Sequence, residues 1–177
     1  KKIAWIGLGR MGLPMATHLV NAGHSLAGYD LNEDSLIRAE AVGIARAKTI
    51  EDAVSGADVV FTMLPQGADV LSVYTDPEGI LAHASPSTLL VDSSTISIAA
   101  CHELHSLAKE AGFRFLDGPV SGGTVGAEDG TLAFMVGGDR EAFDDVSPVI
   151  EPMSANIFHT GGPTTGQVAK ICNNLIL

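Results

Sequence analysis

The chain has 177 residues, which is enough for one α/β domain with a substantial core and too few for two domains of ordinary size. The formal net charge of −11 argues against nucleic acids and anionic membranes as partners, because both attract clustered lysine and arginine. No apolar run approaches the ~20 residues of a membrane-spanning helix, and no signal peptide precedes the first apolar strand, so we expect a cytoplasmic protein.

Apolar runs alternate with helical patterns along the whole sequence. Strands are expected at residues 3–7, 25–29, 58–63, 88–92, 113–116, 132–136 and 155–159. Helices are expected at 11–22, 33–42, 49–55, 67–74, 96–111, 139–151 and from about 165. This alternation predicts an α/β fold of the Rossmann type, a doubly wound and mostly parallel sheet with helices on both faces. The strands after residue 113 fit either parallel or antiparallel pairing.

The first strand leads into a glycine-rich turn of the pattern G-x-G-x-x-G, which opens an amphipathic helix. The turn consists of Gly7, Leu8, Gly9, Arg10, Met11 and Gly12. Gly7 permits the tight turn, Gly9 lets the backbone approach a pyrophosphate, and Gly12 lets the helix pack closely on the strand. The N–H groups at the start of the helix then face the phosphates. A glycine turn without function has the same pattern, but the strand before it and the helix after it favour a dinucleotide site.

An acidic residue, Asp30, follows the second strand, 18 residues beyond Gly12. A carboxylate at this place accepts the ribose hydroxyls of NAD and repels the 2′-phosphate of NADP. Leu31 and Asn32 supply no arginine for such a phosphate. The other interpretation of Asp30 is a turn residue or the N-cap of a helix. We expect NAD rather than NADP as the cofactor.

Two further strand ends are expected at the same crevice, because ligands bind at the carboxyl ends of parallel strands. One is Met63-Leu64-Pro65 and the other is Val91-Asp92-Ser93-Ser94-Thr95. Each has a second interpretation. Pro65 also fits the end of a strand, and Ser94 or Thr95 also fits the N-cap of the helix expected at 96.

Small polar residues recur in the last third of the chain. Ser121-Gly122-Gly123 offers a hydroxyl and two unhindered backbone N–H groups, which suits a carboxylate, although a flexible turn has the same composition. Thr164-x-x-Gln167 has the form of a capping box, so the last helix is expected to begin near 165.

Lys170 and Asn174 are then four residues apart on one face of that helix. Between 167 and 177 the only other ionisable side chain is Cys172. A lysine partly shielded from water has a lowered pKa, which suits proton transfer.

No spacing of histidines or cysteines predicts a metal site. His102 and His105 are expected to form a surface pair on a helix. Cys101 and Cys172 are far apart in sequence and are expected to be buried, reduced thiols.

Four segments, in this order and at this spacing, resemble the β-hydroxyacid dehydrogenase family. They are 7–16 (GLGRMGLPMA), 92–95 (DSST), 117–123 (DGPVSGG) and 166–174 (GQVAKICNN). The resemblance covers nearly the whole chain and is strongest to the 3-hydroxyisobutyrate dehydrogenases of the family. Tartronate semialdehyde reductases are the alternative within the family. A non-catalytic NAD(P)-binding module is the alternative in another class, and the presence of Lys170 argues against it.

The resemblance implies oxidation of a 3-hydroxy acid, namely 3-hydroxyisobutyrate to methylmalonate semialdehyde, with hydride transfer to NAD and Lys170 as acid and base. It implies that residues 7–12 and Asp30 bind the adenosine and pyrophosphate. The ribose and nicotinamide would contact Leu64, Pro65, Asp69 and Thr95. The substrate would contact Ser121, Gly122, Gly123 and Asn174. Asp69 departs from the asparagine that is frequent at this position in the family.

The resemblance also implies the domain organisation. Residues 1–163 would form the NAD-binding domain, and 164–177 would begin a long helix into an absent, all-helical C-terminal domain that completes the site and forms a homodimer or homotetramer. The chain alone is then expected to bind NAD weakly and to be inactive. The expected partner is a small 3-hydroxy acid, with no metal, and the compartment is the bacterial cytoplasm or the mitochondrial matrix.

Overall fold

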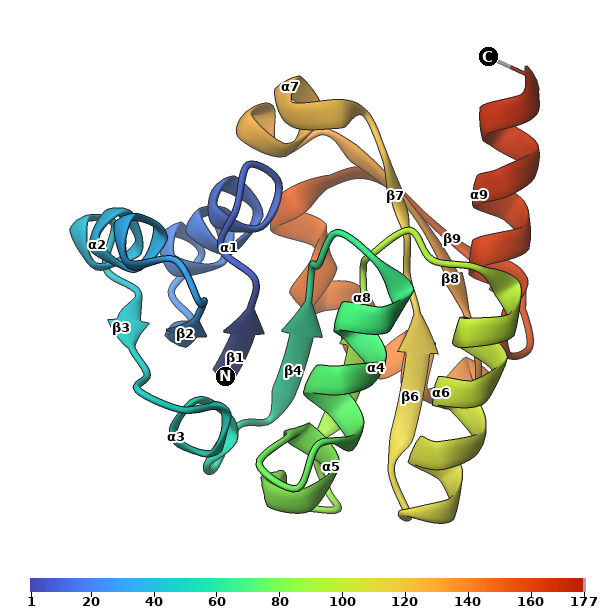
Figure 1. The fold of residues 1–177 in the computed structure, drawn as a ribbon. Helices are drawn as coiled ribbons and strands as arrows, with labels where there is room; N and C mark the ends of the chain where they lie inside the picture. Colours follow the sequence, from blue (N-terminus) through green and yellow to red (C-terminus); the bar gives the residue numbers. More distant parts are fainter. Residues whose placement is uncertain (177) are drawn as a thin grey trace.

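A computed structural model describes residues 1–176 of the chain (Figure 1). Within these residues, nine strands form one sheet: β1 (Lys2–Ile6), β2 (Ser25–Tyr29), β3 (Ala45–Arg46), β4 (Val59–Thr62), β5 (Leu89–Asp92), β6 (Arg114–Asp117), β7 (Val120–Ser121), β8 (Leu132–Gly137) and β9 (Ser154–Gly161). The helices are α1 (Gly12–Asn21), α2 (Glu33–Ala41), α3 (Ile50–Val54), α4 (Gly67–Thr75), α5 (Ile80–His83), α6 (Ile98–Glu110), α7 (Gly123–Asp129), α8 (Arg140–Ile150), the 3-10 turn η1 (Glu151–Met153) and α9 (Thr165–Ile176).

The sheet has the order β3-β2-β1-β4-β5-β6-β8-β7, and β9 pairs with β8. The strands from β1 to β6 are parallel to one another. β8 runs antiparallel to β6 and β7, and β9 is parallel to β8. The predicted mostly parallel α/β sheet of the Rossmann type is therefore confirmed, and the pairing left open after residue 113 is mixed.

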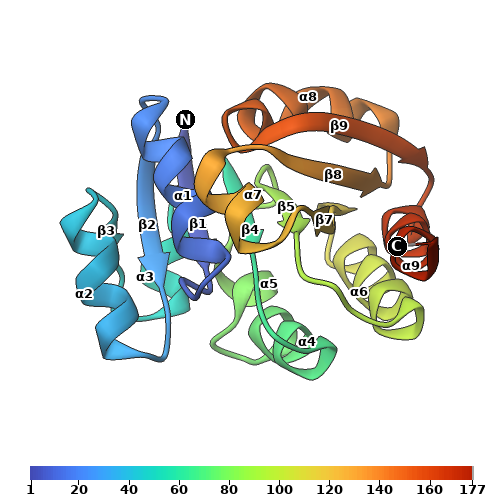
Figure 2. The ribbon, with the colours of Figure 1, turned by 90° about the horizontal axis from the view of Figure 1, so that it is seen from above.

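Helices cover both faces of the sheet because alternate residues of each central strand point to opposite sides. In β1, Ile3 and Trp5 belong to the core under α1 and α8, whereas Ala4 and Ile6 belong to the core under α3 to α6. Figure 2 shows α1 and α8 on one side of the strands and α4, α5 and α6 on the other. None of the helices in residues 1–176 is long and apolar enough to cross a membrane.

The predicted strands and helices correspond to observed elements, with short additions. β3 and β7 have two residues each, and α5 has four, so none of them shows a period in the sequence. The helix expected from 96 begins at Ile98, because the Ser97 side chain accepts a hydrogen bond from the Ala100 N–H. The interpretation of Ser94 or Thr95 as the N-cap is therefore wrong.

Candidate functional site

A cavity of about 540 Å³ lies at the carboxyl ends of β1, β2 and β4. The order of the sheet reverses between β1 and β4, and such a reversal opens a crevice in parallel α/β folds. Most of the predicted cofactor residues line this cavity: Gly7, Gly9, Arg10, Met11, Gly12, Asp30, Leu64, Pro65 and Asp69. Two predicted residues, Leu8 and Thr95, are not among the lining residues.

The glycine turn is shaped as the sequence predicts. Gly7 has a φ of +98°, and a Cβ there would collide with the carbonyl oxygen of Met63. A Cβ on Gly9 would meet no atom within 4 Å, so its backbone faces open space. Within residues 1–176 no side chain caps the start of α1. The Leu13 N–H donates to the Gly9 carbonyl oxygen and Pro14 has no N–H, so the Gly12 N–H is the group that this helix start leaves available to an anion.

Asp30 is held at the mouth of the cavity by two backbone groups. Its Oδ2 accepts from the Leu8 N–H at 2.7 Å, and its Oδ1 accepts from the Asn32 N–H at 2.8 Å. The side chain of Leu8 is buried in the core, so this residue contributes to the site through the backbone that Asp30 fixes. The N-cap interpretation of Asp30 is wrong, because Asn32 caps α2. Each carboxylate oxygen of Asp30 keeps a lone pair for a ligand hydroxyl.

A buried network lies beneath the cavity at the end of β5. Asp92 Oδ1 accepts hydrogen bonds from the hydroxyls of Thr62 and Ser94, each at 2.7 Å. The Ser94 hydroxyl in turn accepts from the Leu64 N–H at 2.9 Å, which fixes the segment that lines the cavity. Asp92 is fully buried, and this desolvation raises its pKa to about 6. Among the described residues, Asp92 Oδ2 has no hydrogen-bond partner.

The predicted substrate segment lies against α9. Ser121 ends β7, and its hydroxyl accepts from Asn173 Nδ2 at 3.2 Å. Gly122 and Gly123 are exposed and lead into α7, which the sequence did not predict. Asn173 precedes the predicted Asn174, which is exposed. The motif Asn173-Asn174 was the available signal, but nothing in its spacing shows which amide reaches Ser121.

Lys170 lies on α9 one turn before Asn173, on the same side of the helix. Lys170 is half-buried, and desolvation lowers the pKa of its amine, as predicted. The contact between Asn173 and Ser121 brings this side of α9 to the predicted substrate segment. The helix that carries this partly shielded amine is therefore bonded to the segment that offers a hydroxyl and exposed glycine backbone.

The start of α9 is capped by Asp117 from the end of β6. Its carboxylate accepts from the backbone N–H groups of Thr164 and Gln167, each at 3.0 Å. The predicted capping box is wrong, because Thr164 has a φ of +73° and the Gln167 side chain points away to the loop before α6. A buried carboxylate distant in sequence has replaced the local cap.

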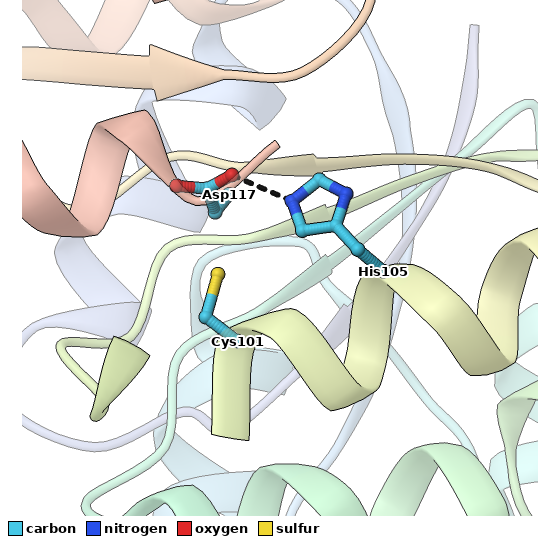
Figure 3. A group of neighbouring side chains, drawn as sticks. All are labelled: Cys101, His105 and Asp117. Carbon is cyan, nitrogen blue, oxygen red and sulfur yellow. Dashed lines mark hydrogen bonds and ion pairs between the residues drawn. The ribbon is translucent and has the colours of Figure 1, made fainter. Parts of the chain in front are cut away.

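His105 also binds this carboxylate. His105 Nε2 donates to Asp117 Oδ1 at 2.6 Å, and its side chain is only 10% exposed (Figure 3). The expected surface pair is therefore wrong for His105, and only His102 is exposed. Of the two cysteines expected to be buried, Cys101 is buried beside this pair, whereas Cys172 is exposed.

Ligand atoms of Cys101, His105 and Asp117 lie within 4.8 Å of one another, as a metal centre would require. Burial and the nearby Asp117 carboxylate raise the pKa of the Cys101 thiol, which opposes the thiolate that a metal binds. Asp117 already accepts three hydrogen bonds. The cluster therefore fits a buried support for α9 better than a metal site.

Comparisons with known proteins agree on one kind of domain. The model described as "NAD binding domain of 6-phosphogluconate dehydrogenase" matches residues 2–161. An NAD-dependent L-serine dehydrogenase of Pseudomonas aeruginosa is 50% identical over 177 residues, all of this chain and 59% of that protein. A 3-hydroxyisobutyrate dehydrogenase of the same species is 44% identical over 175 residues, 99% of this chain and 59% of that protein.

A solved structure of Mycobacterium tuberculosis 3-hydroxyisobutyrate dehydrogenase with L-serine has a TM-score of 0.95 to this chain and 48% sequence identity. The match covers 99% of this chain and 59% of that one. The chain thus spans about 59% of the length of these relatives.

Proposed function

Because the chain belongs to the family of NAD-binding domains represented by that of 6-phosphogluconate dehydrogenase, we propose that it is the cofactor half of an NAD-dependent 3-hydroxyacid dehydrogenase. The observation that carries this proposal is the contact between α9 and the Ser121 segment, which brings the side of α9 that bears Lys170 to a loop suited to a carboxylate. A domain that binds a dinucleotide without catalysing a reaction would not require a partly shielded lysine on the helix that contacts such a loop.

The residues at the cavity fit a dinucleotide. The backbone at Gly9 faces open space, and the uncapped start of α1 would hold the pyrophosphate. Asp30 would accept the ribose hydroxyls, which favours NAD over NADP. Leu64, Pro65 and Asp69 would line the rest of the cofactor cavity. Thr95 would contact the cofactor outside this cavity. When bound, the cofactor supplies the acceptor for a hydride.

Lys170 would move the proton. Its lowered pKa increases the neutral fraction of the amine, and a neutral amine removes the proton of the substrate hydroxyl during oxidation. The same amine, protonated, returns the proton during reduction. The Ser121 hydroxyl and the backbone of Gly122 and Gly123 would hold the substrate carboxylate, and Asn174 would orient the substrate.

Two substrates are proposed, 3-hydroxyisobutyrate first and L-serine second. Both carry a carboxylate and a primary hydroxyl on C3, so one anchored carboxylate presents the same carbinol carbon to the cofactor. L-serine is included because a relative that is 50% identical is named as an L-serine dehydrogenase, and because the solved structure of similar fold holds L-serine. We propose that residues 1–163 form the cofactor domain, that 164–177 begin a connecting helix, and that activity and a homo-oligomer need further chain.

The first prediction tests this function in the complete protein. Reduction of NAD is measured with 3-hydroxyisobutyrate, L-serine, glycerate and 3-hydroxypropionate. Lys170→Met should lower kcat by roughly 10² to 10⁴-fold, since it removes the acid and base, with NAD binding unchanged. Lys48→Met, which alters an exposed lysine far from α9 in sequence, is the matched control.

Residues 1–177 alone should bind NAD and turn nothing over. A wild-type protein that reduces NAD with none of the four acids would refute the proposed function. Equal turnover by wild type and Lys170→Met would refute the role of the lysine alone.

A further inference from the structure

We propose that Gln167 is a positioning residue that locks the loop carrying Thr95 to the helix carrying Lys170. The inference rests on the proposed function, because it concerns the relative placement of the groups that act on hydride and proton. It is carried by hydrogen bonds that connect segments more than 70 residues apart in sequence.

The side-chain amide of Gln167 is fully buried, and both its nitrogen and its oxygen have a hydrogen-bond partner. Its Nε2 donates to the Ser94 carbonyl oxygen at 2.7 Å, and its Oε1 accepts from the Ile96 N–H at 3.2 Å. These two partners flank Thr95 on either side. An amide offers a donor and an acceptor on one planar group, so neither a carboxylate nor an apolar side chain of the same size makes both bonds.

The backbone of Gln167 has no freedom to follow a displaced loop. Its N–H donates to Asp117 Oδ2 at 3.0 Å, within the cap of α9. At the preceding residue, Gly166, a Cβ would come within 2.7 Å of the carbonyl oxygens of both Met135 and Asp117. The start of α9 is thus packed against the sheet. The Gln167 side chain holds the loop around Thr95 to this fixed helix end. Figure 1 and Figure 2 both show α9 beside α6 and the loop that precedes it.

Gln167 lies three residues before Lys170 on the same helix. One side chain therefore links the position of Thr95 to that of the helix segment that carries Lys170. A misplacement of about 1 Å between reacting groups costs up to roughly 10²-fold in rate. The predicted adenosine contact Asp30 is bonded to Leu8 and Asn32 and makes no hydrogen bond with Gln167.

The second prediction uses Gln167→Met and Gln167→Glu in the complete protein. Either variant should lower kcat roughly 10- to 100-fold, with the dissociation constant for NAD changed by less than about threefold. The control is Thr88→Val, which removes another buried hydrogen bond, from the Thr88 hydroxyl to the Ala57 carbonyl at the opposite end of β5. All assays are run below the unfolding temperature of every variant.

Two readouts separate positioning from loss of folded protein. The kinetic isotope effect, with substrate deuterated at the carbinol carbon, should rise in the Gln167 variants, because hydride transfer becomes slower in every molecule. A smaller folded fraction leaves the isotope effect unchanged. Amide hydrogen exchange at Ile96 should accelerate at least tenfold in Gln167→Met and stay at the wild-type rate in Thr88→Val.

Unchanged exchange at Ile96 in Gln167→Met would overturn the proposed lock, whatever the activity. Faster exchange with wild-type kcat and isotope effect would overturn the positioning role. If Gln167→Met fails to fold, the same exchange and kinetic measurements are made on Gln167→Glu, which keeps the side-chain volume. A wild-type protein that oxidises none of the four acids would refute the proposed function instead. The exchange experiment would still test whether Gln167 holds the loop around Thr95.

Discussion

Asp30 combines two tasks in one carboxylate, since it fixes the glycine turn through Leu8 and is proposed to select the cofactor. The third prediction is that Asp30→Asn lowers the preference for NAD over NADP by roughly tenfold or more, because a neutral amide no longer repels a 2′-phosphate. Calorimetric dissociation constants for both cofactors, on residues 1–177, measure this ratio. Asp34→Asn, an exposed acid in the first turn of α2, is the control, and a ratio that is unchanged in Asp30→Asn contradicts the assignment.

At the residue scale, the sequence predicted the positions that belong to a local motif. The glycine turn and Asp30 belong to one local unit, in which their geometry follows from two neighbouring strands, the turn and the helix between them. Asp117, Gln167 and His105 act through partners brought together only by the packed sheet. Asp117 reaches residues 47 and 50 positions away, which no spacing rule anticipates.

At the element scale, α9 depends on a cap that comes from another element. The fourth prediction is that Asp117→Ala lowers the free energy of unfolding by about 3 kcal/mol or more, because three hydrogen bonds to one buried carboxylate are lost. Asp139→Ala is the matched control, since Asp139 caps α8 at the surface and its loss should cost only about 1 kcal/mol. Urea unfolding of residues 1–177 measures both, and equal costs would contradict the special role of Asp117.

Long elements could be predicted because their apolar period extends over several residues, as in the thirteen-residue α6. β3 and β7 could not, since two residues define no period. α7 lies within Gly123–Asp129, where two glycines indicate a turn rather than a helix. The Thr164-x-x-Gln167 pattern gave a wrong prediction for a different reason: the Gln167 side chain bonds to Ser94 and Ile96, and Asp117 caps the helix instead.

The whole molecule responds to pH through Asp92, whose pKa burial raises from 3.8 to about 6. The folded state favours the protonated carboxyl, so its stabilising contribution is fully present below pH 3.8 and is lost as pH rises through about 6. The fifth prediction is that Asp92→Asn gains stability relative to wild type by about 3 kcal/mol as pH rises from about 4 to about 7. Urea unfolding followed by circular dichroism measures the difference, and parallel pH profiles of the two proteins would contradict it.

At the scale of the whole fold, the alternation of strands and helices was sufficient to predict layers, parallel pairing and the crevice at the carboxyl ends of β1, β2 and β4. The direction of β8 was not predictable, because an antiparallel strand between β6 and β9 has the same apolar pattern as a parallel one. β7 continues the line of β6 beyond Gly118-Pro119 and pairs along the same edge of β8, so the mixed end of the sheet begins with β8.

Trp5 gives the molecule an optical property. It is the only tryptophan of the chain, it is fully buried, and its ring stacks on Phe61 at a centroid distance of 5.1 Å. Its indole Nε1 donates to the Gly7 carbonyl oxygen at 2.9 Å, directly under the glycine turn. The emission band of a buried indole overlaps the absorption band of a reduced nicotinamide. Light absorbed by Trp5 should therefore pass to a reduced nicotinamide bound in the crevice, and the emission of this single tryptophan would then report the redox state of the bound cofactor.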